Sequence, residues 1–363
     1  MNIKNTVVKK DCEFIHAKIK HKIDLFNRST ILITGCAGFL GFYILNYLCY
    51  FAKELNIKKI IAIDNFILGK PSWIEDLVKH NLNYLEIHSC DINSFNLSEI
   101  QDLNEVDFVI HGASIASPIF YRKYPLKTID ANIWGLRKLL DFYATKKSLK
   151  GLLFFSSSEI YGDPDPSFIP TSEEYRGNVS CHGPRACYDE SKRFGETLCW
   201  VYASEYKMPI IIARPFNNYG PGMKLDDGRL PADFARSVIN KNTINIFSDG
   251  KPTRTFCYVA DAIAGYFLCL LYGKYNYFNI GIESPEISVL EAALIYKKAA
   301  KDIFNYEIIV NYSINKDINY LTHNPTRRCP DISKAKELIG YDPSINIEEG
   351  IYKFLNFFRQ DLT

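Results

Sequence analysis

Short apolar runs alternate with longer amphipathic segments from residue 31 to Pro215. The runs are rich in Ile, Leu, Val and Phe, a composition that predicts buried strands. The predicted strands lie at 31–34, 59–63, 84–88, 107–111, 152–156 and 209–213, and the predicted helices at 39–55, 126–143 and 186–206. Because strands that are apolar throughout must be covered on both faces, this alternation predicts an α/β fold with a doubly wound parallel sheet of the Rossmann type.

The pattern loosens after Pro215, where Gly and Pro become frequent. Strands are predicted at 244–247 and 277–280, and helices near 259–271, 289–300 and 332–338. We therefore expect a Rossmann domain over 29–214 and a smaller α+β, mainly substrate-binding part over 215–363, with 259–280 returning to the first domain. Ahead of both, 1–28 forms a Lys-rich extension whose apolar residues recur at helical spacing, which predicts a short packing or oligomer-contact helix.

Composition narrows the function classes. The 363 residues include 43 Lys and Arg against 41 Asp and Glu, so a net charge of +2 gives no general attraction to nucleic acid or to an acidic membrane. The ten cysteines form no CxxC pair, and no apolar run reaches the roughly 18 residues of a membrane span. We expect buried free thiols and a cytoplasmic protein, without a signal peptide. His111 and His182 have no second ligand at metal spacing, so no metal site is expected.

A glycine-rich turn follows the first predicted strand. Gly35, Gly38 and Gly41 stand as G-x-x-G-x-x-G, with Phe39 and Leu40 opening the next helix. Such a turn lets the backbone approach a pyrophosphate and points helix N–H groups at it. These five residues are predicted to bind a dinucleotide.

The second predicted strand ends at Asp64, whose carboxylate can accept both adenosine-ribose hydroxyls and would repel a 2′-phosphate. NAD is therefore favoured over NADP, although Lys70 nearby works against that choice. Asp91 is a candidate for the adenine amino group, and a helix N-cap is an equal alternative for it. Asn65 and Ile92 are also predicted to bind the cofactor, and so are Tyr188 and Lys192 further along the chain.

Tyr188 and Lys192 stand as Y-x-x-x-K, which places them on one face of a helix. A nearby ammonium favours the phenolate and lowers the pKa of a tyrosine from its usual value of about 10. A phenolate beside a nicotinamide can take the proton of an alcohol while hydride leaves its carbon.

At this point the chain resembles the extended short-chain dehydrogenase/reductases, a family of NAD-dependent sugar-nucleotide epimerases, dehydratases and decarboxylases. The resemblance covers about residues 30–360 and is most specific to the UDP-glucuronate decarboxylases. It rests on HGASIASPIFY, SSSEIYGDP, GPRACYDESKR, ARPFNNYGPGM, DDGRLPADF, TRTFCYVAD and RRCPDISKAKELIGYDP. It implies a UDP-sugar substrate, a resident NAD and a homodimer paired through helices near 126–143 and 186–206.

The resemblance also assigns roles. Ser157 aligns with the residue that hydrogen-bonds the sugar 4-hydroxyl, and Glu159 with the group that serves acid/base chemistry near C5. Ser158 stands where dTDP-glucose dehydratases have an aspartate, which argues against that activity but not against GDP-mannose dehydratases. Together with Tyr188 and Lys192, Ser157 and Glu159 are the expected catalytic residues.

A glucuronate carboxylate needs positive charge. Arg185 and Arg328 are the candidates, because arginine matches a carboxylate in a bidentate way, and Arg327 is the alternative to Arg328. Tyr121 aligns with an active-site tyrosine near the sugar. The residues expected to hold the diphosphate and nucleoside are Asn217 or Asn218, Arg229 and Arg254.

Gly222 and Cys329 depart from the decarboxylase pattern, which has Arg and commonly Lys there, so the base and sugar stay open. The favoured activity is oxidation of UDP-glucuronate at C4, loss of CO2 and re-reduction to UDP-xylose. The alternative is a 4-epimerase or 4,6-dehydratase of the same family, and a third interpretation is a non-catalytic NAD-binding regulatory protein. The sequence does not decide whether the 4-keto product is re-reduced or released.

Overall fold

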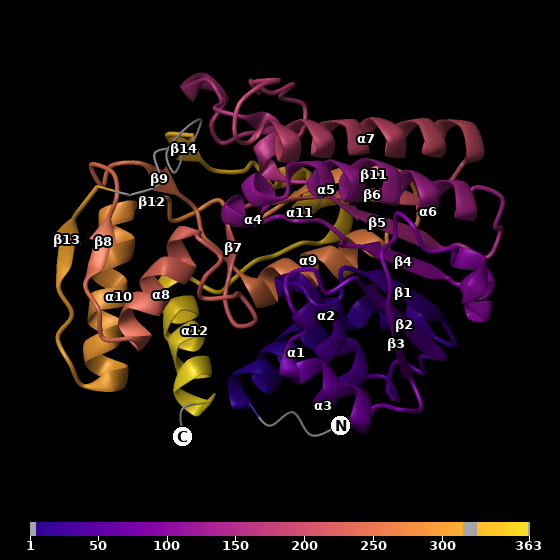
Figure 1. Cartoon of the computed structure of the whole chain (residues 1–363), viewed down its shortest axis with the longest axis horizontal. Helices are drawn as coiled ribbons and strands as arrows, with labels where there is room; N and C mark the ends of the chain where they lie inside the picture. The colour runs from indigo at the N-terminus through magenta and orange to yellow at the C-terminus, as the bar shows by residue number, and fades with distance from the viewer. Residues whose placement is uncertain (1–4, 315–324, 362–363) are drawn as a thin grey trace.

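A seven-stranded parallel sheet forms the centre of the computed structural model, which describes residues 5–314 and 325–361 (Figure 1). The ends of the predicted N-terminal extension and of the C-terminal part therefore lie outside the described residues. In spatial order the strands are β11 (Asn276–Ile280), β6 (Ile210–Pro215), β5 (Gly151–Phe155), β4 (Phe108–His111), β1 (Thr30–Thr34), β2 (Lys59–Asp64) and β3 (Leu85–Ser89). The order reverses between β1 and β4, which is the arrangement of a doubly wound fold and confirms the predicted class.

Helices cover both faces of the sheet, as Figure 1 shows. One face carries α1 (Thr6–Ile19), α2 (Phe39–Tyr50), α3 (Ser72–His80) and α9 (Val259–Leu270), and the other carries α5 (Pro125–Asp130), α6 (Leu136–Tyr143) and α7 (Ala186–Tyr206). Side chains alternate along each strand, so Ile31 and Ile33 join the first core and Leu32 the second. This two-sided burial explains why the central strands β1, β4 and β5 are mainly apolar.

The helix predicted at 126–143 is interrupted. A π-helical turn at Ala131–Gly135 separates α5 from α6. Inside it Asn132 is fully buried, and its amide donates to the Ser191 hydroxyl at 2.8 Å. Gly135 has no room for a side chain, because an added Cβ would lie 2.7 Å from the Ile92 side chain.

The C-terminal part packs beside the carboxyl ends of the strands (Figure 1). Its helices are α8 (Leu230–Ile239), α10 (Val289–Phe304), α11 (Ser333–Ile339) and α12 (Ile347–Asp361). Its short strands are β7 (Asn218–Tyr219), β8 (Ile244–Ile246), β9 (Thr253–Arg254), β10 (Cys257–Tyr258), β12 (Ile287–Ser288), β13 (Val310–Tyr312) and β14 (Arg327–Arg328), while α4 (Pro118–Lys123) follows β4. Between these short elements the chain returns to the main sheet through α9 and β11.

The predicted N-terminal helix forms as α1 and packs against α2, α9 and α12. Its buried Asp11 accepts hydrogen bonds from the hydroxyls of Tyr43 at 2.7 Å and Tyr258 at 2.6 Å, and Lys353 on α12 lies 3.2 Å away. The extension thus joins the Rossmann sheet to the C-terminal helix within one chain.

The ten cysteines are free thiols, and seven of them are buried. This agrees with the expectation drawn from their apolar surroundings. Over the described residues, no helix is long and apolar enough to cross a membrane, and no cluster of His, Cys, Asp and Glu could hold a metal ion.

Candidate active site

Two neighbouring cavities, of about 350 and 590 Å³, lie at the carboxyl ends of the strands. Both are lined by Thr34 at the end of β1, by Gly112 after β4 and by the glycine turn. Asp64 at the end of β2 lines only the larger cavity, and Ser156 after β5 only the smaller. Ligands of open α/β sheets bind at this edge, beside the reversal of strand order.

The glycine turn forms the wall that the cavities share. Gly35 has φ +71°, and an added Cβ would lie 2.5 Å from the backbone of Gly112. A Cβ on Gly41 would lie 2.3 Å from the Cys36 carbonyl oxygen, so neither position admits a side chain. Gly38 is the N-cap of α2, which begins at Phe39. The unpaired N–H groups of this first turn suit a pyrophosphate.

The larger cavity also holds the predicted adenosine residues. Asp64 accepts hydrogen bonds from the backbone N–H of Ala37 at 2.9 Å and of Phe66 at 2.8 Å. The Asn65 amide donates to Asp91 at 3.0 Å, and both line the cavity. Asp91 accepts from the N–H of Asn93 in a tight turn and is not the N-cap of any described helix. The side-chain-free cradle, the carboxylate and the adjoining cavity fit a dinucleotide without a 2′-phosphate.

The predicted cofactor residues Leu40 and Ile92 lie in different cavities. Leu40 lines the smaller cavity and Ile92 the larger. Lys70 is the residue that worked against the choice of NAD. Its ammonium lies 3.5 Å from Glu75, and its side chain is about half exposed. Lys70 is therefore a solvated loop lysine.

The catalytic candidates meet in the smaller cavity. Tyr188 and Lys192, both on α7, line it together with Ser157, which follows β5. The Lys192 ammonium donates to the Phe155 carbonyl at 2.7 Å and lies 5.6 Å from the centre of the Tyr188 ring. Tyr121 stacks on that ring at 5.2 Å, with its own buried hydroxyl unpaired.

The predicted lowering of the tyrosine pKa is wrong for the protein's own groups. Burial raises the pKa of Tyr188 to about 12, and a hydrogen bond with Ser157 offsets only part of this rise. Burial also lowers the pKa of Lys192 to about 7. Desolvation is the largest cause of both shifts, because both groups are almost completely buried.

Glu159 lies between the two arginines expected to bind a carboxylate. It forms an ion pair with Arg185 and another with Arg328 at 2.9 Å. Burial raises the pKa of Glu159, but Arg185 and Arg328 together lower it to about 2, so this carboxylate is ionised at neutral pH.

Asp189 is a second carboxyl in this cluster. It lies 3.5 Å from Arg185, and one of its oxygens is buried without a hydrogen-bond partner. Burial and the charge of Glu159 raise the pKa of Asp189 to about 7. Sequence reasoning missed this residue, although its i,i+4 spacing from Arg185 on a helix is a usable signal.

The two neighbouring arginines of β14 have different surroundings. Arg328 is 4% exposed, lines the smaller cavity and donates to the Ser158 hydroxyl at 2.9 Å. Arg327 is 41% exposed at its side chain and pairs with Glu286 at 2.7 Å. Of the two, only Arg328 is placed to meet a ligand in this cavity.

The remaining substrate candidates also line the cavity. Arg254 donates to the carbonyls of Thr253 at 2.7 Å and Thr326 at 3.0 Å. Arg229, which lines both cavities, pairs with Asp227. Asn217 lines the smaller cavity, and so does Asn218, whose side chain is buried against Tyr266. The site therefore gathers every predicted catalytic and substrate residue, and their roles stay predictions.

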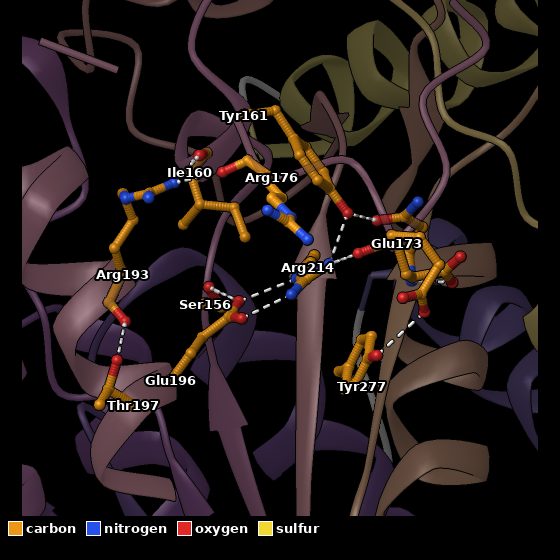
Figure 2. A network of polar contacts seen from close by, with 12 residues as sticks. Ser156, Ile160, Tyr161, Glu173, Arg176, Arg193, Glu196, Thr197, Arg214 and Tyr277 are labelled. Carbon is orange, nitrogen blue, oxygen red and sulfur yellow. Dashed lines mark hydrogen bonds and ion pairs between the residues drawn. The ribbon is translucent and has the colours of Figure 1, made fainter. Parts of the chain in front are cut away.

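A buried ion pair between Arg214 and Glu196 lies next to the segment that carries the catalytic candidates (Figure 2). Arg214, at the end of β6, donates to Glu196 on α7 at 2.9 and 2.6 Å and to the Tyr161 hydroxyl at 2.7 Å. The Ser156 hydroxyl donates to the same Glu196 at 2.5 Å. Because Ser156 precedes Ser157 and Glu196 lies one turn beyond Lys192, this pair joins the two halves of the catalytic group.

Replacing Arg214 with Met is expected to lower the free energy of unfolding by about 3–5 kcal/mol, because Glu196 stays buried without its partner. Unfolding in urea, followed by circular dichroism, measures this. In Arg214→Met/Glu196→Met both charges are removed, and most of the lost stability should return. If the single variant unfolds at the same urea concentration as the unmodified chain, the ion pair does not contribute to stability.

Comparison with known proteins agrees with this geometry. Residues 31–281 match the model of the NAD dependent epimerase/dehydratase family. UDP-glucuronic acid decarboxylase 1 of Xenopus tropicalis is 33% identical over 340 residues, covering 93% of this chain and 73% of that protein. UDP-glucuronic acid decarboxylase 3 of Arabidopsis thaliana is 35% identical over 329 residues, covering 91% of this chain and 89% of that protein.

Among solved structures, the chain is similar to the UDP-glucuronic acid 4-epimerase from Bacillus cereus in complex with UDP-glucuronic acid and NAD. It is 25% identical with a TM-score of 0.72, and the match covers 91% of this chain and 99% of that one. The family model spans more than half of the chain, and the glycine turn, Asp64 and the Tyr188–Lys192 pair all lie within it. The chain belongs to the NAD-dependent epimerase/dehydratase family and is an NAD-dependent enzyme.

Proposed function

We propose that this enzyme decarboxylates UDP-glucuronate through a 4-keto intermediate and returns the sugar as UDP-xylose. The observation that carries the proposal is the pair of buried arginines, Arg185 and Arg328, in the same cavity as Tyr188, Lys192 and Ser157. Buried guanidinium groups beside the oxidising residues suit a substrate with a carboxylate at C6. Relatives named as decarboxylases of this substrate support the same assignment.

The first step is oxidation at C4. When bound, NAD supplies the hydride acceptor for C4 and later returns that hydride. Tyr188 takes the proton of the 4-hydroxyl, relayed by Ser157, which is hydrogen-bonded to it. Lys192, fixed by the Phe155 carbonyl, lies beside the ring, and in its protonated form the ammonium favours the phenolate as it forms.

The second step breaks the bond between C5 and C6. A 4-keto uronate is a β-keto acid, so CO2 can leave while the bond's electrons pass to the ketone as an enolate. Tyr188 and Ser157, placed at the C4 oxygen, stabilise that charge. Glu159 is ionised between the arginines, so the proton for C5 comes from Asp189, the neighbouring carboxyl whose raised pKa of about 7 leaves it partly protonated, and Glu159 passes that proton on.

A 4-epimerase acting on the same uronate is the second candidate. It is favoured by the likeness to the Bacillus cereus epimerase, which was solved with UDP-glucuronic acid. An epimerase must hold the carboxylate but prevent its loss. It must also let the 4-keto sugar rotate in the site, so that the hydride returns to the opposite face of C4. Both reactions use the same oxidation at C4, so the fate of the carboxylate separates them.

Proton NMR of the purified protein with UDP-glucuronate, with and without added NAD, tests the proposal. A growing pentose anomeric signal supports decarboxylation to UDP-xylose. A 4-keto pentose with rising absorbance of NADH means that the oxidised sugar is released. A uronate with inverted C4 would establish the epimerase. No change with this substrate, but conversion of neutral UDP-hexoses, would overturn the role of Arg185 and Arg328.

We further propose a homodimer formed through the outer face of α5, α6 and α7. Trp134 is 60% exposed and Trp200 57% exposed, and Phe194 and Tyr206 on α7 are also about half exposed. These large apolar side chains on adjoining helices form the kind of surface that a partner covers.

The variant Trp134→Ser/Trp200→Ser is expected to sediment as a monomer in analytical ultracentrifugation, while the unmodified chain sediments as a dimer. Phe168→Ser is the matched control, because Phe168 is 54% exposed but lies outside these helices. A double variant that remains dimeric would place the interface elsewhere.

A further inference from the structure

A segment from the C-terminal part borders the larger cavity. We call residues 220–228, between β7 and α8, the strap. Gly222, Met223, Lys224, Leu225 and Asp227 of the strap line the cavity that also contains Asp64, Asn65 and Asp91. The strap thus faces the loop that follows β2, from the other side of the expected adenosine site.

The strap is fixed to the Rossmann part at several points. Met223 is 2% exposed within the main core. The Ser117 hydroxyl donates to the Asp227 carbonyl at 2.5 Å. Gly222 has φ +87°, and an added Cβ would lie 2.6 Å from the Phe42 ring. This close approach leaves no room here for the arginine of the decarboxylase pattern.

Lys224 is the strap residue that crosses the cavity. Its ammonium donates to the Leu68 carbonyl at 2.6 Å, joining two segments 156 residues apart in the sequence. Burial raises the pKa of Asp64, and the charge of Lys224 is among the groups that oppose this rise, so the ammonium acts on that carboxylate. In the described parts of the chain no carboxylate forms an ion pair with Lys224, and an ammonium carries three donors.

We propose that Lys224 is a cofactor-binding residue, which donates to an oxygen of the adenosine half of NAD and holds the strap across it. Lys224 lines this cavity and, beyond its hydrogen bond to the Leu68 carbonyl, has donors left that an oxygen of a bound ligand can accept. Leu68 and Lys224 then close the adenosine site from opposite sides. NAD leaves only when the bond between them opens.

Slow release suits this enzyme. In the proposed reaction the cofactor is regenerated in every cycle, so the enzyme gains nothing by exchanging it. The proposal itself rests on the NAD dependence of the family and not on the identity of the sugar. Failure of the UDP-glucuronate experiment would therefore leave it standing.

The test measures NAD binding directly, without turnover. Holoprotein is loaded with NAD and passed through gel filtration, and the retained NAD is quantified by liquid chromatography over time. The dissociation constant is measured by titration calorimetry on stripped protein. Lys224→Met is expected to release NAD about ten- to a hundredfold faster and to bind it correspondingly more weakly, the effect of losing a hydrogen bond from a charged group.

Two variants make the result specific. Lys224→Arg keeps a charged donor and should retain most of the affinity. Lys70→Met removes a lysine of the loop after β2, whose ammonium pairs with Glu75, and should bind NAD like the unmodified protein. Thermal unfolding of each variant without NAD separates a loss of fold from a loss of binding.

The proposal is overturned if Lys224→Met retains NAD as long as the unmodified protein does. It is also overturned if Lys70→Met weakens binding equally, which would indicate a general effect of positive charge. A variant that unfolds more easily but keeps the affinity of the unmodified protein would make Lys224 a structural tie alone.

Discussion

Tyr188→Phe is expected to lower turnover by about 10²–10⁴-fold while NAD stays bound, the range typical for removing a general acid–base group. The phenolic oxygen is the group placed to take the 4-hydroxyl proton, and its ring keeps the stacking with Tyr121 at 5.2 Å. Packing is therefore preserved and only the proton transfer is lost. The measurement is product formation by NMR, together with the NAD content of the purified variant.

Tyr206→Phe is the matched control for this substitution. Tyr206 lies at the end of the same helix, α7, and is 53% exposed. The Tyr206→Phe variant should therefore convert the substrate at the rate of the unmodified enzyme. If Tyr188→Phe keeps a comparable rate, the proton leaves the 4-hydroxyl by another route. If it loses NAD as well, the tyrosine serves binding rather than proton transfer.

Arg328→Met has the second largest expected effect. The guanidinium is almost fully buried, pairs with Glu159 at 2.9 Å and donates to Ser158 and to the Gly162 carbonyl. Under the proposed function, its loss removes one of the two cations expected to hold the substrate carboxylate. We expect kcat/KM for UDP-glucuronate to fall by about 10²–10³-fold, as for a buried charged hydrogen-bond partner.

Two variants separate recognition from packing. Arg327→Met changes the neighbouring arginine, which pairs with Glu286 at the surface, and should leave kcat/KM within about twofold. Arg328→Met/Glu159→Gln also removes the carboxylate that has lost one of its two arginine partners, so it should recover stability but not the affinity for UDP-glucuronate. Equal losses in Arg327→Met and Arg328→Met would contradict the assignment of the carboxylate site.

The Rossmann part was predictable because its signals are local. The central strands of the main sheet are apolar runs, and α7 forms over the predicted range 186–206. The C-terminal part was less so, and α8 and α12 were not predicted. In α12, Gly350 weakens the helix signal, yet a Cβ there would lie 1.9 Å from the Tyr219 hydroxyl. Close packing against a distant residue requires this glycine, and one sequence does not reveal that contact.

The site divides in the same way. The glycine turn and the Tyr188–Lys192 pair have fixed spacings, so they could be recognised. The partners of Glu159 could be expected only from the resemblance, because Arg328 is far from it in the chain. The Arg214–Glu196 pair and the bond from Lys224 to Leu68 join segments without a shared motif. Only the fold brings these residues together.

The fate of the carboxylate tests the central claim most directly. UDP-glucuronate labelled with carbon-13 at C6 is incubated with the enzyme, and labelled CO2 and labelled sugar are quantified together. Our account predicts one CO2 for each UDP-glucuronate consumed, and none from Tyr188→Phe beyond its residual rate. Label that stays entirely in a uronate while the substrate is consumed would contradict decarboxylation and identify an epimerase.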